Sequence, residues 1–335
     1  MRAVLLRLAG ALPALAGVII ATFVLTLVLP GDTAAYFAGP TASPAAIEQI
    51  RHELGLDRSV PEQFAGYVAA LGRGDMGSSL ITGQPVRNDL AARLPASAEL
   101  TLSGLLIAIV VAVPLGIMAA VREGSAWDHT CRLIVTAGVS LPVFFTGLLL
   151  EYVFYFLLGW APARVGRLDA YATPPTTVTG LYLVDSLLAG DLETFRGALA
   201  QLILPATTLG LFALAPIARI TRASMLGVLG ADFIRTARAS GLAPPVIVLT
   251  YAFRNALLPV VTTLGMVFSF LLGANVLVEK VFAWPGVGSY AVEALIASDF
   301  APVQGFVLTM AVLYVLLNLG IDLLNRALDP RLRAA

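Results

Sequence analysis

The fold class follows from residues 100–121, which read LTLSGLLIAIVVAVPLGIMAAV and contain no charged side chain. A bilayer core requires about 20 apolar residues in an α-helix, because no water is present there to bond the backbone groups. The stretch from Leu100 to Val121 meets this requirement along its whole length. It therefore predicts a membrane-spanning helix.

Five further segments of the chain have the same apolar character. They are Leu8–Leu29, Leu133–Trp160, Leu202–Ala218, Ala256–Val278 and Phe306–Leu324. The first is interpreted as a retained span and not as a signal peptide, because Pro30, Gly31 and Asp32 follow it instead of a small-residue cleavage site. The segment from Leu133 is long enough to tilt or to break near Pro142. We expect an all-α polytopic membrane protein with six transmembrane helices.

Composition agrees with this class and excludes others. Of the 335 residues 58% are hydrophobic and only 13% are charged, whereas globular proteins carry about 25% charged residues. The formal net charge of zero excludes a basic nucleic-acid surface of the usual kind. One cysteine excludes a disulfide framework, and the two histidines lie outside the apolar runs. No GxxxxGK[ST] loop surrounds the only lysine. Because of these absences together, no catalytic, cofactor-binding or metal-binding residue is expected in this chain.

The arginines indicate which side of the membrane each loop occupies. Six spans place both termini on one side, and loops rich in arginine remain in the cytoplasm. The arginines of the segments assigned to the inside are Arg2, Arg7, Arg122, Arg132, Arg219, Arg222, Arg235, Arg238, Arg254, Arg326, Arg331 and Arg333. Most carboxylates fall in the other loops. We expect both termini in the cytoplasm.

Two external regions result from this orientation. The first, residues 30–99, is expected to hold a helix from Ser43 to Gly55, a second from Pro61 to Gly72, and an ordered turn region from Gly74 to Gln84. The second external region is Ala161–Gln201. Its apolar run Leu181–Leu188 is too short to span and is interpreted as re-entrant or interfacial.

The cytoplasmic loop 219–258 predicts a helix of its own. Asp232 suits the positive N-terminal end of a helix, Arg238 suits its negative C-terminal end, and Gly241 can take the left-handed conformation after it. Pro244 opens a second helix. The result is a surface helix of about two turns.

The small residues of this helix suggest a docking surface. Ala237, Ala239, Ser240 and Gly241 carry little side-chain bulk, so another protein can approach closely, while the neighbouring arginines offer charge. The alternative is an ordinary basic cytoplasmic loop. The residues alone leave both readings open.

At this point the sequence resembles a known family. The run DFIRTARASGL from Asp232 to Leu242, followed by RNALLP from Arg254 to Pro259, resembles the EAA loop of binding-protein-dependent ABC importer permeases. The resemblance is closest to the dipeptide, oligopeptide and nickel permease family. Matching motifs along the chain are LGLD at 54–57, GDMGSSL at 74–80, RLP at 93–95, LP at 204–205, EKVFAWPGVG at 279–288 and LDPR at 328–331.

Some positions depart from the family pattern. Ala231 and Asp232 stand where Glu-Ala-Ala begins in the general pattern, and Ser240 stands where this family often has lysine. The external segment after Trp160 is longer than usual. This last departure concerns the substrate and not the family.

The resemblance implies a type I ABC importer permease fold. It divides the chain into an N-terminal helix with an external region, 1–95, a transmembrane core, 96–326, with the coupling loop 219–258, and a cytoplasmic tail, 327–335. Such a permease lies in the bacterial inner membrane and forms half of a pathway for di- or oligopeptides. Its implied partners are membrane lipid, a homologous second permease, an external solute-binding protein and two cytoplasmic ATPases, which bind the ATP and Mg.

The resemblance also assigns the coupling helix that docks on one ATPase. The implied coupling residues are Asp232, Phe233, Arg235, Thr236, Ala237, Arg238, Gly241 and Leu242. Trp284, Pro285 and Gly286 are interpreted as an interfacial aromatic followed by a turn, with external gating as the alternative.

Several alternatives remain. Glu151 lies within the third span, where it either lines the pathway, facing a peptide ammonium group or a cation, or bonds to a neighbouring helix. Peptide is the first choice of substrate, nickel or a nickel chelate the second, and another small solute the third. An ion-gradient-driven secondary transporter is disfavoured because the chain lacks two matching halves with interrupted helices. An intramembrane protease is disfavoured because the spans contain no histidine.

Overall fold

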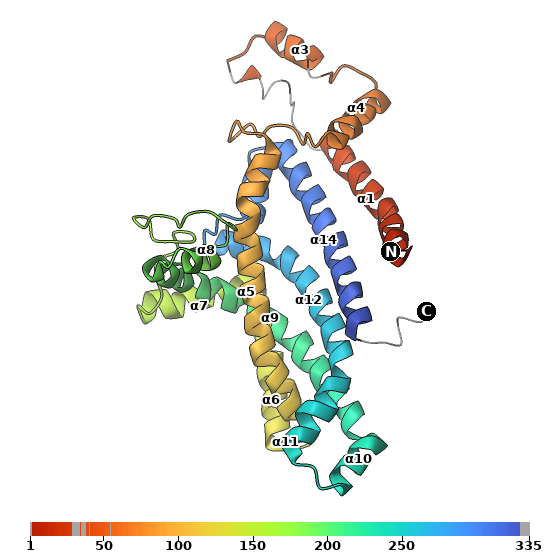
Figure 1. Cartoon of the computed structure of the whole chain (residues 1–335). Helices are drawn as coiled ribbons and strands as arrows, with labels where there is room; N and C mark the ends of the chain where they lie inside the picture. Colours follow the sequence, from red (N-terminus) through yellow and green to blue (C-terminus); the bar gives the residue numbers. More distant parts are fainter. Residues whose placement is uncertain (1, 29–33, 35–37, 40, 54, 329–335) are drawn as a thin grey trace. The chain divides into compact units, whose positions relative to one another are not determined.

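The regular structure of the protein is helical (Figure 1). The computed structural model describes residues 2–28, 34, 38, 39, 41–53 and 55–328. In this part of the chain four helical stretches are long and apolar enough to cross a membrane: Val86–Val121, Leu192–Leu229, Pro244–Val281 and Phe300–Leu324. They correspond to the second, fourth, fifth and sixth expected spans. A helix, α1 (Arg2–Val28), also forms at the expected first span, and its described apolar part is the shorter stretch Leu12–Leu25.

The third expected span is broken. Helix α6 (Ala126–Val139) is followed by α7 (Val143–Glu151) and the π-helix η1 (Tyr152–Leu157), and the two parts are bent by 95°. Pro142 lies at the bend, in an extended conformation with φ −56° and ψ 141°. A proline has no N–H to continue a helix and disfavours helical backbone before it. The expected break near Pro142 is confirmed, and the pair counts as a fifth candidate span if its halves are taken together.

The chain divides into two compact units. One comprises Met1–Leu94 with Tyr290–Val315, and the other comprises Pro95–Ser289 with Leu316–Ala335. Helices α5 (Val86–Val121), α13 (Val287–Ile296) and α14 (Phe300–Leu328) contribute residues to both units.

The first unit contains the two short helices expected after the first span. Helix α3 (Pro44–Glu53) begins beside Ser43, whose Oγ accepts a hydrogen bond from the Ala46 backbone N–H at 3.3 Å. Helix α4 (Val60–Gly72) begins after Ser59, whose backbone N–H and hydroxyl both donate to the Glu62 carboxylate, at 3.0 and 2.7 Å. These hydrogen bonds satisfy groups that the first helical turn leaves unpaired. Both helices are confirmed.

A buried carboxylate orders the turn region of the first unit. Asp299 is 1% exposed, and its Oδ2 accepts hydrogen bonds from the Ser79 hydroxyl at 2.8 Å and from the Leu80 backbone N–H at 2.7 Å. An isolated β-bridge joins Ser78 to Pro85. The expected ordered turn over residues 74–84 is confirmed.

The second unit is built around the contact between α5 and α9 (Leu192–Leu229). A Cβ atom added to Gly104 would lie 2.7 Å from the Leu209 Cβ, and one added to Gly116 would lie 2.7 Å from the Thr221 Cβ. On the other side of the contact, a Cβ on Gly210 would lie 2.9 Å from the side chain of Ile107. Only glycine permits this approach, which resembles the small-residue packing of membrane helices. Helix α9 supplies more of the buried core of this unit than any other helix, and it also packs against α12 (Arg254–Val281).

A buried carboxylate also shapes the segment 161–201 of the second unit. Helix α8 (Tyr182–Leu188) carries Asp185, which accepts backbone hydrogen bonds from Thr179 at 2.8 Å and Gly180 at 2.9 Å. Burial raises the pKa of Asp185, but these hydrogen bonds and that of the Thr179 hydroxyl outweigh it, so the pKa lies below its ordinary value. The resulting stabilisation is present at neutral pH and is lost as the pH falls through the folded-state pKa.

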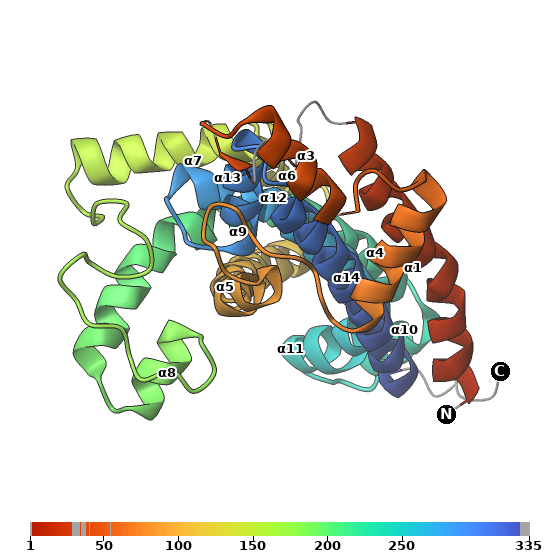
Figure 2. The same ribbon diagram turned by 90° about the horizontal axis from the view of Figure 1, so that it is seen from above.

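A second anchor of this segment is an ion pair. Arg167 Nη2 lies 2.7 Å from Glu99 Oε2, and both side chains are at least nine-tenths buried. Glu99 Oε1 accepts a hydrogen bond from the Leu183 backbone N–H at 2.8 Å, and the Arg167 guanidinium lies 3.5 Å from the ring centre of Tyr182. The loop between η1 and α8, which Figure 2 shows from above, is thus held at Arg167 and at its end beside α8.

The motif at residues 279–288 surrounds another buried carboxylate. Glu279 is fully buried and accepts hydrogen bonds from the Ser97 hydroxyl, from Asn275 Nδ2 at 3.0 Å and from the Ser289 backbone N–H at 2.8 Å. A Cβ on Gly286 would overlap the Glu279 carboxylate. Glycine is therefore required at position 286, because a side chain there would occupy the space of the carboxylate.

Trp284 belongs to the same cluster, and its expected interfacial position is wrong. The side chain is 1% exposed, and its Nε1–H donates to the Ala96 carbonyl at 2.9 Å. A buried indole needs such an acceptor. The tryptophan joins the end of α12 to the part of α5 inside the second unit.

Replacing Gly286 tests the steric role of this motif. Gly286→Ala should lower the thermal stability of the purified protein, by roughly 1–3 kcal/mol, because the new methyl group displaces the Glu279 carboxylate. Gly273→Ala in α12 is the matched control, since its Cβ meets nothing within 4 Å, and it should be neutral or slightly stabilising. Equal melting temperatures for the two variants would contradict this account.

Replacing Asp185 tests what orders the segment before α8. Asp185→Asn should destabilise the loop locally by about 1–3 kcal/mol, because the backbone N–H groups lose a charged acceptor. Limited proteolysis of the reconstituted protein should then cut residues 170–181 faster. Asp169→Asn, in the same segment but exposed, serves as the control. Unchanged cleavage in Asp185→Asn would show that the loop is ordered by other contacts.

Candidate functional site

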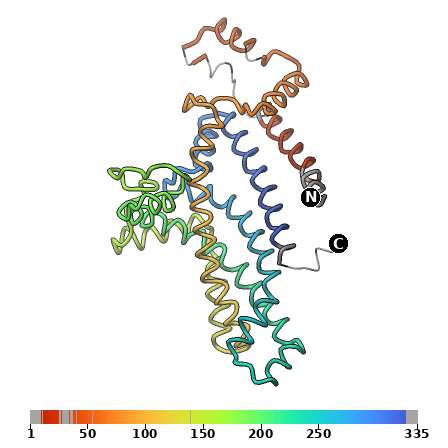
Figure 3. Tube along the Cα trace, in the orientation of Figure 1, coloured from red at the N-terminus to blue at the C-terminus, as the bar shows by residue number. Residues whose placement is uncertain are grey.

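The expected surface helix forms between the fourth and fifth spans. Helix α10 (Asp232–Ala239) follows α9, and Figure 3 traces the chain through it and back toward α12. Gly241 has a φ of +75°, its N–H donates to the Arg238 carbonyl at 3.0 Å, and the Leu242 N–H donates to the Ala237 carbonyl at 3.3 Å. This pair of hydrogen bonds is a Schellman motif, in which the glycine takes the left-handed position. The expected start, length and end of the helix are confirmed.

One face of α10 is packed against the ends of the long helices. Ile234 is fully buried and Ala237 is 6% exposed. Both belong to a core cluster with Ala120 of α5, Met225 of α9 and Ile247. Ala237 therefore contributes to the packing of α10 and not to the surface that a partner can touch, which corrects its place among the exposed small residues.

Ile234 was missed among the expected site residues. It holds α10 on the protein, and its signal in the sequence is the spacing of three between two apolar residues, Ile234 and Ala237, which places both on one helix face. The predicted set was based on charged and small side chains, and most of these lie on the opposite face of the helix. Holding a docking element in place requires this packed face as much as the exposed one.

The other face of α10 is exposed. Asp232, Arg235, Thr236 and Arg238 are open to solvent, and Phe233 is 44% exposed. Asp232 and Arg235 form a surface ion pair with 3.4 Å between Oδ1 and Nη1. Asp232 lies in the first turn and Arg238 in the last, so each charge is opposite in sign to the partial charge of its helix end, which is a favourable arrangement. An exposed aromatic side chain between charges is typical of a protein contact surface.

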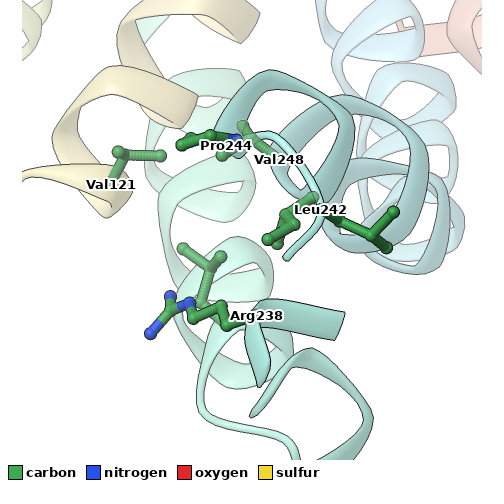
Figure 4. Close-up of a pocket in the computed structure, with 7 residues that line it drawn as sticks. Val121, Arg238, Leu242, Pro244 and Val248 are labelled. Atoms are coloured by element: carbon green, nitrogen blue, oxygen red, sulfur yellow. The ribbon is translucent and has the colours of Figure 1, made fainter. Parts of the chain in front are cut away.

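A pocket of about 270 Å³ lies behind α10 (Figure 4). Val121 at the end of α5 faces Pro244 across it, with Val248 alongside, and Arg238 and Leu242 line the side nearest α10. Two exposed members of the predicted coupling set, Arg238 and Leu242, therefore border both the outer surface and this pocket.

After the turn at residues 240–243, a continuous helical path leads into the fifth span. Pro244 opens α11 (Pro244–Val246), as expected, and the π-helix η2 (Ile247–Phe253) connects it to α12. The expected span Ala256–Val278 is thus the central part of a longer helix that begins at Pro244. Single π-helical stretches inside α-helices occur frequently at functional sites.

Glu151 does not lie near α10, and it has a partner. Its two oxygens face Arg164, with 3.1 Å between Arg164 Nε and Oε1 and 3.2 Å between Nη1 and Oε2. Arg164 also donates to the Val281 carbonyl at 3.3 Å. The ion pair joins the end of α7 to the end of α12 through the segment that follows η1. Sequence reasoning did not identify Arg164, because an isolated arginine in a loop gives no sign of its partner.

Two family models match consecutive parts of this chain. Residues 112–334 match the model described as binding-protein-dependent transport system inner membrane component. Residues 1–101 match the model for the N-terminal part of a binding-protein-dependent transport system membrane component. Together they cover most of the chain.

Full-length relatives carry the same similarity. The chain is 46% identical over 323 residues to the probable D,D-dipeptide transport system permease protein DdpB of Escherichia coli, covering 96% of this chain and 95% of that one. It is 40% identical to the di/tripeptide transport system permease protein DppB of Pseudomonas aeruginosa, covering 98% and 97%. It is 38% identical to the dipeptide transport system permease protein DppB of Escherichia coli, covering 98% of each.

Solved structures share the fold. A chain of the inward facing MetNI methionine ABC transporter superposes with a TM-score of 0.52 at 20% identity, covering 70% of this chain and 93% of that one. A second crystal form of the same transporter gives a TM-score of 0.54 at 18% identity, covering 72% and 96%. The expected type I ABC importer permease fold is confirmed. The chain belongs to the binding-protein-dependent transport system inner membrane component family, and it is a permease subunit of an ABC importer.

Proposed function

We propose that this permease imports di- or oligopeptides. Relatives at 38–46% identity over nearly their full length are named as dipeptide and di/tripeptide permeases. In this proposal the chain forms half of the translocation pathway, a homologous second permease forms the other half, and an external solute-binding protein delivers the peptide. Two cytoplasmic ATPases bind ATP and Mg and supply the energy.

The observation that supports the coupling role is that α10 has one packed face and one exposed face. Its exposed face offers Phe233, Asp232 and Arg235 to an ATPase, while Ile234 on the opposite face is fully buried among the ends of α5 and α9. A displacement of a packed element is transmitted to its neighbours, because protein interiors are close-packed. Movement of an ATPase would therefore reach the spans through Ile234.

The continuous chain from α10 to α12 supports a second route of coupling. Gly241 and Leu242 lead directly to Pro244, where the helix that becomes the fifth span begins. A solvated loop would have neither a helix that leads directly into the span nor a buried face. The proposed coupling residues that touch the ATPase are Asp232, Phe233, Arg235, Thr236, Arg238, Gly241 and Leu242, with Ala237 and Ile234 holding the helix.

The proposal places the chain in the bacterial inner membrane with both termini in the cytoplasm. In this orientation α10 faces the ATPases, and α3 and α4 face the binding protein. The arginine distribution along the sequence supports it. The Glu151–Arg164 pair lies on the external side in this orientation, where its opposite charges neutralise one another.

Replacing Gly241 tests the coupling role. Gly241→Arg should abolish ATPase association or ATP-driven uptake of a labelled dipeptide in the assembled importer, since the side chain projects where the ATPase approaches. The positive φ adds about 1 kcal/mol of backbone strain. Gly190→Arg is the matched control, because Gly190 also has a positive φ, +70°, and open space around it, but lies at the external end. The control should transport normally.

The outcomes distinguish three explanations. Loss of uptake in Gly241→Arg alone supports docking at α10, and equal loss in both variants would attribute the effect to backbone strain. Normal uptake with the ATPases still bound to Gly241→Arg would refute the coupling role. Gradient-driven uptake by the unmodified chain without ATPases would instead indicate a secondary transporter.

Cysteine labelling tests the orientation. In a Cys131→Ala background, Ala65→Cys in α4 should react with a membrane-impermeant thiol reagent added outside spheroplasts, and Ala239→Cys in α10 should react only after permeabilisation. Both positions are exposed, so access to the reagent depends on the side of the membrane. The reverse pattern would overturn the topology.

A further inference from the structure

A second cavity of the second unit, of about 220 Å³, lies between α5, α6 and α9. Its uncharged lining includes Leu115, Gly116, Ala119, Val135, Ala218 and Ala223. Most of these side chains are small, which is why space remains between the helices. Three arginines, Arg132, Arg219 and Arg222, complete the lining. An apolar cavity bordered by three guanidinium groups suits a ligand that is apolar at one end and anionic at the other.

The order of residues along the helices separates the two ends of the cavity. Arg222 lies one helical turn beyond Ala218, nearer the end of α9 that leads to α10. Arg132 lies one turn before Val135, nearer the start of α6. The charged part of the cavity therefore lies toward the loop ends of the helices, and the apolar part lies toward their middle.

The charges around the cavity are not balanced. Asp128 binds Arg222 through two hydrogen bonds of 2.8 Å and lies 3.6 Å from Arg132. Glu123 lies 4.0 Å from Arg222, and His129 Nδ1 lies 2.8 Å from Arg132 Nη2. Two carboxylates thus face three guanidinium groups.

Arg219 supplies the unbalanced charge. Within the part of the chain that the structure describes, its guanidinium makes no hydrogen bond or ion pair, and the side chain is exposed. The bidentate contact with Asp128 fixes Arg222 beside it. One fixed and one available guanidinium at the same cavity form an anion-binding pair.

The cavity also offers apolar surface beside the arginines. Leu115, Ala119 and Val135 contribute this surface. A free phosphate would use the arginines and leave this surface without a function. A phospholipid would use both, since its acyl chains extend over apolar side chains that flank its headgroup site.

We infer that this cavity binds an anionic phospholipid, with its phosphate at Arg219 and Arg222 and an acyl chain along Leu115 and Val135. The bound lipid would contact α5, α6 and α9 together, next to the end of α9 that continues into α10. Lipid binding does not depend on the proposed substrate or on the ATPases, so it can fail or succeed independently of the proposed function.

Native mass spectrometry of the purified full chain tests the inference. The protein is mixed with equal amounts of phosphatidylglycerol and phosphatidylcholine that carry the same acyl chains. The unmodified chain should retain phosphatidylglycerol preferentially, and Arg219→Gln should reduce this preference about fivefold, the contribution of one arginine near an anionic lipid. Arg196→Gln is the control, because Arg196 is also exposed and on α9, roughly 35 Å along the helix.

A second variant tests the cavity and not the charge. Ala223 is exposed and lines the cavity, so Ala223→Leu should fill it while leaving all arginines in place and the melting temperature unchanged. It should lose the phosphatidylglycerol preference as Arg219→Gln does. Equal lipid binding by both variants and the unmodified chain would overturn the inference.

Two further arms identify the source of the anion. Millimolar inorganic phosphate should not displace the lipid, and displacement would show that phosphate alone is the ligand. The preference should also persist in the importer assembled with its ATPases and second permease. Its loss on assembly would show that a protein partner covers this cavity, which would equally overturn a lipid site.

Discussion

The contact between α5 and α9 is the constraint on which the second unit depends. Gly104 and Gly116 on one helix and Gly210 on the other bring the backbones so close that any side chain there would collide with the opposite helix. In a membrane the hydrophobic effect does not drive helices together, so close van der Waals contact of this kind must hold them. The two helices end near one another, which creates the platform of Ala120 and Met225 for Ile234.

Buried carboxylates fix the irregular parts of the chain around this helical core. Asp185 of the second unit and Asp299 of the first accept backbone hydrogen bonds from loop residues, and Glu279 accepts one from the first turn of α13, in place of the water that burial removes. A buried charge is costly unless such bonds surround it. Each carboxylate therefore specifies one loop conformation, because other conformations would leave it without donors.

The sequence was informative where the signal is local. Apolar length predicted the spans, Pro142 predicted the broken third span, and the order of Asp232, Arg238 and Gly241 predicted α10 with its ends. These features depend on backbone chemistry within a few residues.

Long-range contacts could not be predicted in the same way. Tryptophan is a residue type typical of the membrane interface, yet the indole N–H of Trp284 donates a hydrogen bond to the carbonyl of Ala96, which lies 188 residues away in the chain. The partnership of Glu151 with Arg164 depends on how a loop folds back over two helix ends. Ile234 was overlooked because its importance appears only when the buried surface of α10 is known. Pairing of this kind is set by tertiary packing, which local patterns do not contain.

Two glycines of the chain tolerate different substitutions. Gly241 has a positive φ and open space around it, so asparagine, which also adopts the left-handed conformation, can replace it at modest cost. Gly286 has no positive φ, and its space is occupied by the Glu279 carboxylate. Asparagine there would fit the backbone and collide with the neighbour. Two glycines that look alike in the sequence are therefore expected to differ in natural variation, one exchanging with asparagine and the other with no larger residue.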